Sequence, residues 1–220
     1  MSSHYTVKDY QHPALIICNG QSCDRLLLDQ LLQWSPLVIV LDSAIERVLP
    51  LGVKVDVLLG DFDRSMDFQY YQNYFQSIEI HSVPNQDKTD LEKAFDFLLQ
   101  KGIESVNLVW STGKRLDHTL NNVSSMAKYK SKLKIVGYDD NSVFYFLPKK
   151  FKKWYTKETK LSLIPYGEVL DVESENLYYS LEKHQLKLGI QTSSSNYVKE
   201  EGIVTIKHKA GDLLLLECWD

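Results

Sequence analysis

The feature that most constrains the fold is the alternation, over residues 1–140, of short apolar runs rich in β-formers with amphipathic helical stretches. Strands that alternate with helices in this way build a parallel sheet covered by helices. The strands are expected at Ala14–Cys18, Leu37–Leu41, Val55–Leu59, Ile78–Ser82, Val106–Trp110 and Lys134–Tyr138. Helices are expected at Cys23–Trp34, Asp90–Lys101 and Thr119–Lys130. The sequence therefore predicts an α/β domain with a parallel sheet over residues 1–140.

Two of these helices carry recognisable local signals. Thr89 and Glu92 have the spacing of a capping box at the start of the second helix, and Gly102 follows as its expected stop. The first helix has four apolar residues at helical spacing, which predicts one buried face: Leu26, Leu27, Leu31 and Trp34.

Residues 141–220 have a different pattern, with strand-like runs and no long helical stretch between them. The strands are expected at Val143–Leu147, Lys160–Ile164, Asn176–Leu181, Gln185–Leu188, Gly202–Lys207 and Leu213–Cys218. These runs predict a second, mostly antiparallel β domain of the size of a small sandwich. The lysine-rich and aromatic join at 149–160 is expected to be a solvated loop or hairpin, with phosphate or nucleic-acid binding as the alternative.

Charge and cysteine content limit the partners and the cellular compartment to be expected. A formal net charge of −4 and a pI near 5.9 give no general attraction to nucleic acid or to anionic membranes, so neither is expected as a partner. Cys18, Cys23 and Cys218 have no metal-ligand spacing, and their odd number favours a reducing compartment. No signal peptide or membrane-spanning run is seen, which predicts a cytoplasmic protein.

Two carboxylates follow the predicted strand Val55–Leu59 directly, in the turn Gly60-Asp61-Phe62-Asp63. Ligands of open α/β sheets bind beyond the carboxyl ends of the strands. Acids two residues apart on an extended chain point the same way and repel one another unless a cation lies between them. Hard cations prefer carboxylate oxygen, so the turn is a candidate Mg²⁺ site. The alternative is a solvated acidic loop.

A second acidic cluster contains Asp87 and Asp90, between the strand Ile78–Ser82 and the helix that Thr89 caps. Aspartate is also common at helix starts, where it complements the helix dipole. By itself this cluster is therefore compatible with a purely structural role at the start of the helix.

The third candidate is the segment 111–118, which follows the strand ending at Trp110. It lacks the first glycine of a Walker A loop. It nevertheless combines Gly113, the cations Lys114 and Arg115, Asp117 and a helix start, which are the groups that hold a polyphosphate and its metal. His118 beside the helix start is expected to be structural more often than a general base.

Three strand-to-helix connections thus present acids at one edge of the predicted sheet. Five aspartates gathered there would destabilise one another unless a divalent metal neutralised them: Asp61, Asp63, Asp87, Asp90 and Asp117. The matching chemistry is Mg²⁺-dependent phosphoryl transfer, in which positioning and charge neutralisation supply most of the catalysis.

At these residues the chain resembles the thiamin pyrophosphokinase family, which transfers pyrophosphate from ATP to the hydroxyl of thiamin to give thiamin diphosphate and AMP. The segments that carry the resemblance are Gly60-Asp61-Phe62-Asp63, Gln86–Asp90 with Lys93, Gly113 with Arg115–His118, and Ser194-Ser195-Asn196. Order and spacing together make the match specific, and it spans nearly the whole chain.

The resemblance implies a Rossmann-like domain followed by a β sandwich, with Mg²⁺ as cofactor and ATP as donor. It also implies a homodimer whose thiamin site lies between the α/β domain of one subunit and the β domain of the other. The implied catalytic residues are Asp61, Asp63, Asp90 and Asp117, of which Asp61, Asp63 and Asp90 bind the metal. The implied nucleotide contacts are Asp42, Ser43, Gln86, Asp87, Thr89, Lys93, Thr112, Gly113 and Arg115. The implied thiamin contacts are Gln86, Asp117, Ser195 and Asn196.

The chain departs from the family pattern at three places. Asp42-Ser43-Ala44 stands where a glycine pair often follows the aspartate, and Trp110 and Lys114 stand at positions that are often glycine. Trp110 and Lys114 are expected to affect nucleotide preference or phosphate contacts. The aromatic partner of the thiazolium ring stays open among Tyr197, Trp219 and Trp154.

Two alternatives remain at this point. A strand followed by Asp61-x-Asp63 also suits a haloacid-dehalogenase-like phosphatase, and Asp139-Asp140 resembles its later metal motif. That fold places its aspartates on the first strand, however, whereas two strand–helix units precede them here. A module that senses a nucleotide or thiamin without turnover is the second alternative.

Overall fold

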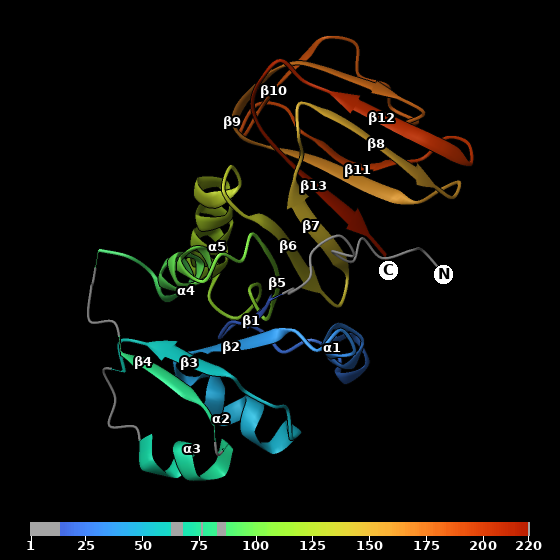
Figure 1. The fold of residues 1–220 in the computed structure, drawn as a ribbon. Helices are drawn as coiled ribbons and strands as arrows, with labels where there is room; N and C mark the ends of the chain where they lie inside the picture. Colours follow the sequence, from blue (N-terminus) through green and yellow to red (C-terminus); the bar gives the residue numbers. More distant parts are fainter. Residues whose placement is uncertain (1–13, 63–67, 76, 83–86, 220) are drawn as a thin grey trace. The chain divides into compact units, whose positions relative to one another are not determined.

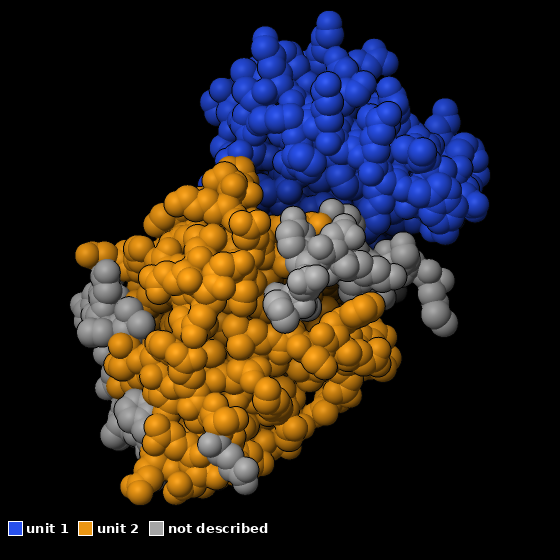
Figure 2. All heavy atoms as spheres, in the orientation of Figure 1, with its two compact units in different colours: residues 1–6, 141–220 blue, residues 7–140 orange. Residues whose placement is uncertain are grey.

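The structure is a computed structural model that describes residues 14–62, 68–75, 77–82 and 87–219. The described chain divides into two compact units between Asp140 and Asn141, which Figures 1 and 2 show. Each unit is described separately. None of the described helices is long and apolar enough to cross a membrane.

The first unit is a parallel sheet with helices. Its strands are β1 Ala14–Ile17, β2 Leu37–Leu41, β3 Val57–Gly60, β4 Glu79–Ser82, β5 Ser105–Val109 and β6 Lys134–Asp139. Its helices are α1 Arg25–Leu32, α2 Ile45–Val48, α3 Phe68–Phe75, α4 Asp90–Gln100 and α5 Leu116–Tyr129, with 3₁₀ turns at Asp42–Ala44 and Leu49–Leu51. All six strands are parallel, in the order β4-β3-β2-β1-β5-β6. The predicted α/β class is confirmed.

The strand order reverses at β1. The chain runs outward from β1 to β4 and then returns to the other side of β1, where β5 pairs with it (Figure 1). Every residue of β1, β3 and β5 is buried, as expected for parallel strands rich in Val, Ile and Leu and covered on both faces. The connections after β1 and β5 therefore leave the sheet side by side at a topological switch point.

The predicted face of the first helix was wrong in part. Leu28 and Leu31 are the buried residues of α1, whereas Leu26 and Trp34 are 66% and 52% exposed. Because residues 26–28 are three consecutive leucines, the sequence is compatible with more than one buried face of the helix. Asp24 begins the helix, since its side chain accepts a hydrogen bond from the Leu26 N–H, and packing against the sheet decides which face is buried.

The second unit is an antiparallel β sandwich. Its strands are β7 Ser142–Phe146, β8 Lys150–Tyr155, β9 Lys160–Glu175, β10 His184–Lys187, β11 Ser193–Tyr197, β12 Gly202–Lys207 and β13 Ala210–Cys218. The long strand β9 organises it. Its first half pairs with β11 and β13, and its second half pairs with β10 and β12. Gly167 and Asp171, both with positive φ, lie in the second half, where bends of this kind let one strand serve two layers.

Two predictions in this unit were wrong. Residues 176–181 form no strand, because Asn176 takes a left-handed conformation and its side chain binds the Glu200 backbone instead. The lysine-rich join, expected as a solvated loop or hairpin, contains strand β8. Phe151 and Tyr155 of β8 point into the sandwich, while the residues between them are more exposed. This is the alternation of a β-strand, which the many lysines made hard to recognise in the sequence.

A buried charge cluster ties three strands of the sandwich together. Glu217 on β13 accepts hydrogen bonds from Tyr145 on β7 at 2.5 Å and from Tyr155 on β8 at 2.9 Å. Lys153 on β8 forms an ion pair with it at 2.8 Å. The lysine and glutamate side chains are only 13% and 9% exposed, so each charge depends on the other for compensation.

Replacement of Glu217 by Ala is expected to lower the free energy of unfolding by about 3–5 kcal/mol, because it removes the carboxylate that compensates the charge of Lys153 in a nearly dry site. Urea denaturation measures the loss. The matched control is Glu200→Ala, whose ion pair with Lys157 at 3.7 Å is exposed and should be worth less than about 1 kcal/mol. Equal losses in the two variants would contradict the assignment of the cluster.

Candidate active site

A cleft of about 720 Å³ opens at the carboxyl ends of the parallel strands. Asn19 follows β1, Asp42 and Ser43 follow β2, and Asp61 follows β3, so each strand end contributes a polar group. The remaining walls come from the beginning of α4 and from the connection between β5 and α5. The residues that line it there include Lys88, Thr89, Asp90, Lys93, Gly113, Lys114, Arg115 and His118.

The floor of the cleft is a close contact between the loops that follow β1 and β5. The N–H of Gly20 donates to the carbonyl of Trp110 at 2.6 Å, and the N–H of Gln21 donates to that of Thr112 at 2.7 Å. A Cβ on residue 20 would lie 2.3 and 2.4 Å from the Thr112 and Trp110 carbonyl oxygens. Glycine is thus required here by space, since no backbone group so close can move aside cheaply.

A Gly20→Ala variant is expected to lose about 1–3 kcal/mol of stability from overpacking and to bind the cleft's ligand more weakly, because the two loops must separate. Thermal denaturation and ligand titration check the two effects. Gly102→Ala is the control, since residue 102 has positive φ but open space around its Cβ, far along α4 from the cleft. It should lose stability and keep ligand affinity. Unchanged affinity in Gly20→Ala would contradict the role of this contact.

Three carboxylates act on one another in the cleft. Burial is the largest cause of a raised pKa at Asp90, and the charges of Asp61 and Asp42 raise that pKa further. Lys93, whose side chain is only 4% exposed, opposes the shift through an ion pair with Asp90 at 3.0 Å. The net direction is upward because burial, together with the smaller contributions of Asp61 and Asp42, outweighs the ion pair with Lys93.

Asp90 is placed by the first turn of α4. The predicted capping box is present: the Glu92 N–H donates to Thr89 Oγ1 and the Thr89 N–H donates to Glu92 Oε2, both at 3.2 Å. Asp90 is the first residue of that helix, where the helix dipole favours an acid. The cap therefore fixes the position of this carboxylate at the cleft.

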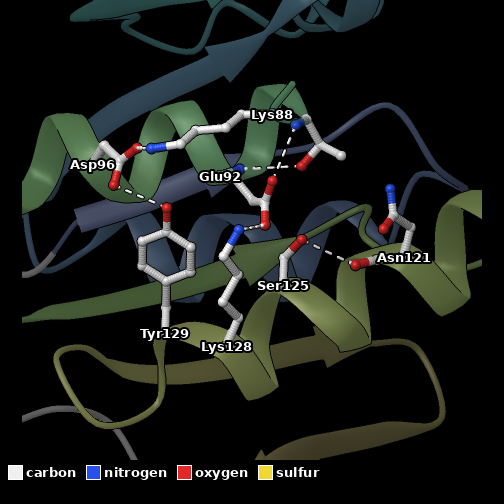
Figure 3. A network of polar contacts seen from close by, with 8 residues as sticks. Lys88, Glu92, Asp96, Asn121, Ser125, Lys128 and Tyr129 are labelled. Atoms are coloured by element: carbon white, nitrogen blue, oxygen red, sulfur yellow. Dashed lines mark hydrogen bonds and ion pairs between the residues drawn. The ribbon is translucent and has the colours of Figure 1, made fainter. Parts of the chain in front are cut away.

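A polar network fixes α4 to α5 (Figure 3). Glu92 of the capping box also accepts an ion pair from Lys128 on α5 at 2.8 Å. Asp96, one turn further along α4, accepts hydrogen bonds from Lys88 at 2.6 Å and from Tyr129 at 2.8 Å. The start of α4, with Lys88 and Asp90, is thus held by the adjacent helix as well as by its own cap.

The raised pKa of Asp90 gives a testable pH dependence of stability in the metal-free protein. The folded state holds this proton more tightly than the unfolded chain, so the stability it contributes is present below about pH 4 and is lost as pH rises through the raised pKa. Asp90→Asn mimics the protonated form. In urea titrations with EDTA, the wild type should lose stability relative to this variant as pH rises above about 4. A difference that shrinks over that range would contradict the assignment.

The donor set suits a hard divalent cation. Within the described ranges no three Asp, Glu, His or Cys side chains lie close enough to form a complete metal site. Asp63 lies outside the described residues, as does Gln86. Asp61 and Asp42 nevertheless lie close enough to Asp90 for their charges to raise its pKa, and carboxylate oxygens are the ligands that Mg²⁺ prefers, so these carboxylates fit the ion.

Some of the predicted site residues lie away from the cleft. Asp117 does not line it; it is 64% exposed and pairs with Arg115, whose Nε donates at 3.1 Å. These hydrogen bonds from Arg115 lower the pKa of Asp117 to about 2. Thr112 donates to Asp139 at 3.2 Å, and Asp87 is exposed. Asp117, Thr112 and Asp87 therefore lie outside the cleft lining in this state.

Asn19 was missed by the sequence analysis. Its Nδ2 donates to Ser43 Oγ at 2.7 Å, which joins the ends of β1 and β2 across the cleft. No motif marks it. Its position directly after a buried strand could have identified it as a site residue, as the same position identified Asp61.

The β unit contains an aromatic patch beside the predicted thiamin contacts. Tyr178 and Tyr197 stack with ring centroids 4.5 Å apart, and Tyr178 and Tyr179 are 54% and 60% exposed. Asn196 is 1% exposed and uses both ends of its amide within the protein, accepting from the Tyr179 N–H at 3.1 Å and donating to the Tyr179 carbonyl at 2.8 Å. Ser195 is exposed next to it. Asn196 thus positions Tyr179 in this patch.

Comparison with known proteins decides the family. Residues 28–137 match the model of the thiamin pyrophosphokinase catalytic domain, and residues 149–213 match the model of the thiamin pyrophosphokinase vitamin B1 binding domain. The chain belongs to the thiamin pyrophosphokinase family. The resemblance stated from the motifs is confirmed, and the haloacid-dehalogenase-like alternative is not favoured, in agreement with the place of Asp61 after the third strand of the chain.

Relatives and solved structures of this family agree along most of the chain. Thiamine pyrophosphokinase 3 of Oryza sativa subsp. japonica is 26% identical over 175 residues, which are 73% of this chain and 65% of that protein. Thiamine pyrophosphokinase 1 of Arabidopsis thaliana is 26% identical over 208 residues, 88% of this chain and 74% of that protein. The chain thus spans just under two thirds of the rice protein.

The fold of the family is seen in crystal structures. Thiamine pyrophosphokinase from Bacillus subtilis superimposes with a TM-score of 0.76 at 22% identity, covering 94% of this chain and 99% of that chain. Yeast thiamin pyrophosphokinase superimposes with a TM-score of 0.81 at 17% identity, covering 94% and 86%. A parallel α/β domain followed by a β domain is therefore the family architecture.

Proposed function

We propose that this member of the thiamin pyrophosphokinase family transfers pyrophosphate from ATP to the hydroxyl of thiamin, giving thiamin diphosphate and AMP. The observation that carries the proposal is that Asp42 and Asp61 at strand ends and Asp90 at the start of α4 line one cleft, which Lys88, Lys114 and Arg115 also line. Acids for a metal beside cations for phosphate oxygens are the groups that phosphoryl transfer needs.

The reaction is an in-line displacement. The thiamin hydroxyl oxygen forms a bond to the β-phosphorus, and the bond from that phosphorus to the oxygen bridging the α-phosphate breaks, so the leaving group is AMP. In a loose transition state a neutral alcohol needs little deprotonation, so the chain's main task is to align the reactants and balance charge. The hydroxyl proton is then released to solvent or to a nearby carboxylate.

Acidic and basic residues of the cleft have different tasks in this reaction. Asp61, Asp63 and Asp90 would hold Mg²⁺, with Asp42 close enough to share its charge. The ion, when bound, would neutralise phosphate oxygens and lower the repulsion of an incoming nucleophile. Lys93 keeps Asp90 in place through their ion pair. Arg115, at the mouth of the cleft, is free to exchange the exposed Asp117 for a phosphate oxygen at little cost.

The β unit is proposed to bind thiamin at the tyrosine patch. The thiazolium ring is a cation, and cations bind the faces of aromatic rings. Tyr178, Tyr179 and Tyr197 offer such faces next to the exposed Ser195.

We further propose a homodimer in which Gln86 and Asp117 of one subunit reach thiamin held by the β unit of the other. The odd number of cysteines, Cys18, Cys23 and Cys218, supports the cytoplasmic location that we also propose.

A product assay tests the proposal directly. The protein is incubated with thiamin, Mg²⁺ and each nucleoside triphosphate in turn, and thiamin diphosphate and the nucleotide product are separated chromatographically. Equimolar thiamin diphosphate and AMP, formed only when thiamin is present, is the expected result. Phosphate release without thiamin would favour a phosphatase, and ligand binding without product would favour a sensing module.

Asp61→Asn is expected to lower kcat by about 100-fold or more, because it removes one charge from the metal-binding group and leaves the fold intact. Mg²⁺ should raise the Tm of the wild type, and this shift should shrink in the variant. Steady-state kinetics and thermal denaturation with and without Mg²⁺ measure both. The control is Asp29→Asn on the exposed face of α1, which pairs only with Arg25 and should retain normal kinetics. Normal turnover in Asp61→Asn would remove this residue from the site.

A further inference from the structure

We propose that Lys128 and Tyr129 of α5 are positioning residues for Asp90, on which they act through two carboxylates of α4. Neither residue is among those that line the cleft, and neither belongs to the motifs of the sequence. The inference rests on the proposed function, because it names residues that affect metal binding and turnover through Asp90.

The first chain of contacts runs from Lys128 through Glu92 to the residue before Asp90 (Figure 3). Lys128 Nζ donates to Glu92 Oε1 at 2.8 Å. The other oxygen of this carboxylate, Oε2, accepts from the Thr89 N–H at 3.2 Å. Because the Glu92 side chain is only 11% exposed, these two contacts define its orientation. Helix α5 thus holds the backbone amide that directly precedes Asp90.

The second chain of contacts lies beside the first and runs from Tyr129 through Asp96 to Lys88 (Figure 3). Tyr129 Oη donates to Asp96 Oδ1 at 2.8 Å, and Lys88 Nζ donates to Asp96 Oδ2 at 2.6 Å. Both chains begin at adjacent residues of α5 and end at adjacent residues of the segment before Asp90. We call these two chains, Lys128–Glu92–Thr89 and Tyr129–Asp96–Lys88, the double tether.

The double tether adds direction to an apolar contact between the two helices. Phe95 of α4 packs on the ring of Tyr129 with the centroids 5.2 Å apart, and Leu91 on the same helix is buried. Apolar burial is non-directional, whereas hydrogen bonds weaken steeply when donor and acceptor are misaligned. A shift of α4 along α5 would therefore break contacts of the double tether before it exposed much apolar area.

The position of Asp90 is what this restraint controls. Asp90 is the first residue of α4 and lines the cleft, and its ion pair with Lys93 at 3.0 Å holds its carboxylate on the helix. Mg²⁺ demands near-ideal octahedral geometry, so a carboxylate that binds it tolerates little displacement. His118 and Asn122 at the start of α5 line the same cleft. The double tether thus fixes two walls of the cleft relative to one another.

A purely structural role of these contacts has a different consequence. The Lys128 side chain is 58% exposed, and those of Lys88 and Asp96 are 38% and 32% exposed. Ion pairs of this exposure add little to stability. Loss of the double tether should therefore lower Tm only slightly, yet weaken metal binding and turnover, because a small displacement of a site group has a large effect on the reaction.

Titration with Mg²⁺, followed by the rise in Tm, tests the proposal on Lys128→Met, Tyr129→Phe and the double variant. Tyr129→Phe removes the hydroxyl and keeps the ring on Phe95. Each single variant should weaken Mg²⁺ binding about threefold, since the other chain of contacts remains. The double variant should weaken it about 30-fold, which exceeds the product of the single effects. Lys128→Arg keeps the ion pair and should bind Mg²⁺ normally.

Leu98→Ala is the matched control for lost stability. Leu98 is fully buried in the last turn of α4, so its truncation should lower Tm more than either tether variant and leave the double tether intact. This variant should keep the Mg²⁺ affinity of the wild type. Unchanged Mg²⁺ affinity in the double variant, or an equal loss in Leu98→Ala, would overturn the proposal.

Steady-state kinetics provide a second readout. The double variant should lower kcat for thiamin diphosphate formation about tenfold or more and leave the KM for thiamin unchanged, as expected for an interaction that acts on the metal-binding acid. A raised KM for thiamin with normal kcat would contradict the role of the double tether. The Mg²⁺ titration needs neither thiamin nor turnover, so a wild type that forms no thiamin diphosphate would refute the proposed function and leave the titration result standing.

Discussion

The contact on which the cleft depends is the approach of the loop after β1 to the loop after β5. Two backbone hydrogen bonds join them, and a carbonyl oxygen lies 2.3 Å from where a Cβ of residue 20 would be. Only glycine permits this distance. Reversal of the strand order at β1 creates a crevice, and this contact forms its floor. It also fixes the distance between the loop of Asn19 and the loop of Gly113, so groups far apart in sequence line one cleft.

Burial and like charges act together on the ionisable groups of the cleft. Burial and, to a smaller extent, the charges of Asp61 and Asp42 raise the pKa of Asp90 in spite of Lys93, while loss of hydration and the charge of Arg47 lower the pKa of Lys114. Under the proposed function, a metal bound to a polyphosphate would relieve both repulsions. In the supporting elements, by contrast, acids are paired: Glu92 forms an ion pair with Lys128, and Asp96 accepts hydrogen bonds from Lys88 and Tyr129 (Figure 3).

The six strands and the helices α1, α4 and α5 of the α/β unit were predictable to within a few residues because their signals are local, whereas the short helices α2 and α3 were not predicted. Thr89 and Glu92 identify a helix start from four residues of sequence, and the structure has that capping box. Leu26 and Trp34 were misplaced because three consecutive leucines satisfy more than one helical face, and only packing against the sheet chooses between them. Strand β8 was missed because its alternation lies in Phe151 and Tyr155, among lysines that dominate the composition.

The sequence by itself determined the family, the order of the elements and the acids that follow successive strands, since motif spacing and periodicity are properties of the chain. Only the tertiary structure decided which of the predicted residues meet. It brought Asp42 into electrostatic contact with Asp90, left Asp117 outside the cleft lining, turned Asn196 inward to hold Tyr179 and placed Arg47 over Trp110. The reason is physical: these contacts depend on strand order, loop conformation and side-chain direction, which no local pattern in the sequence specifies.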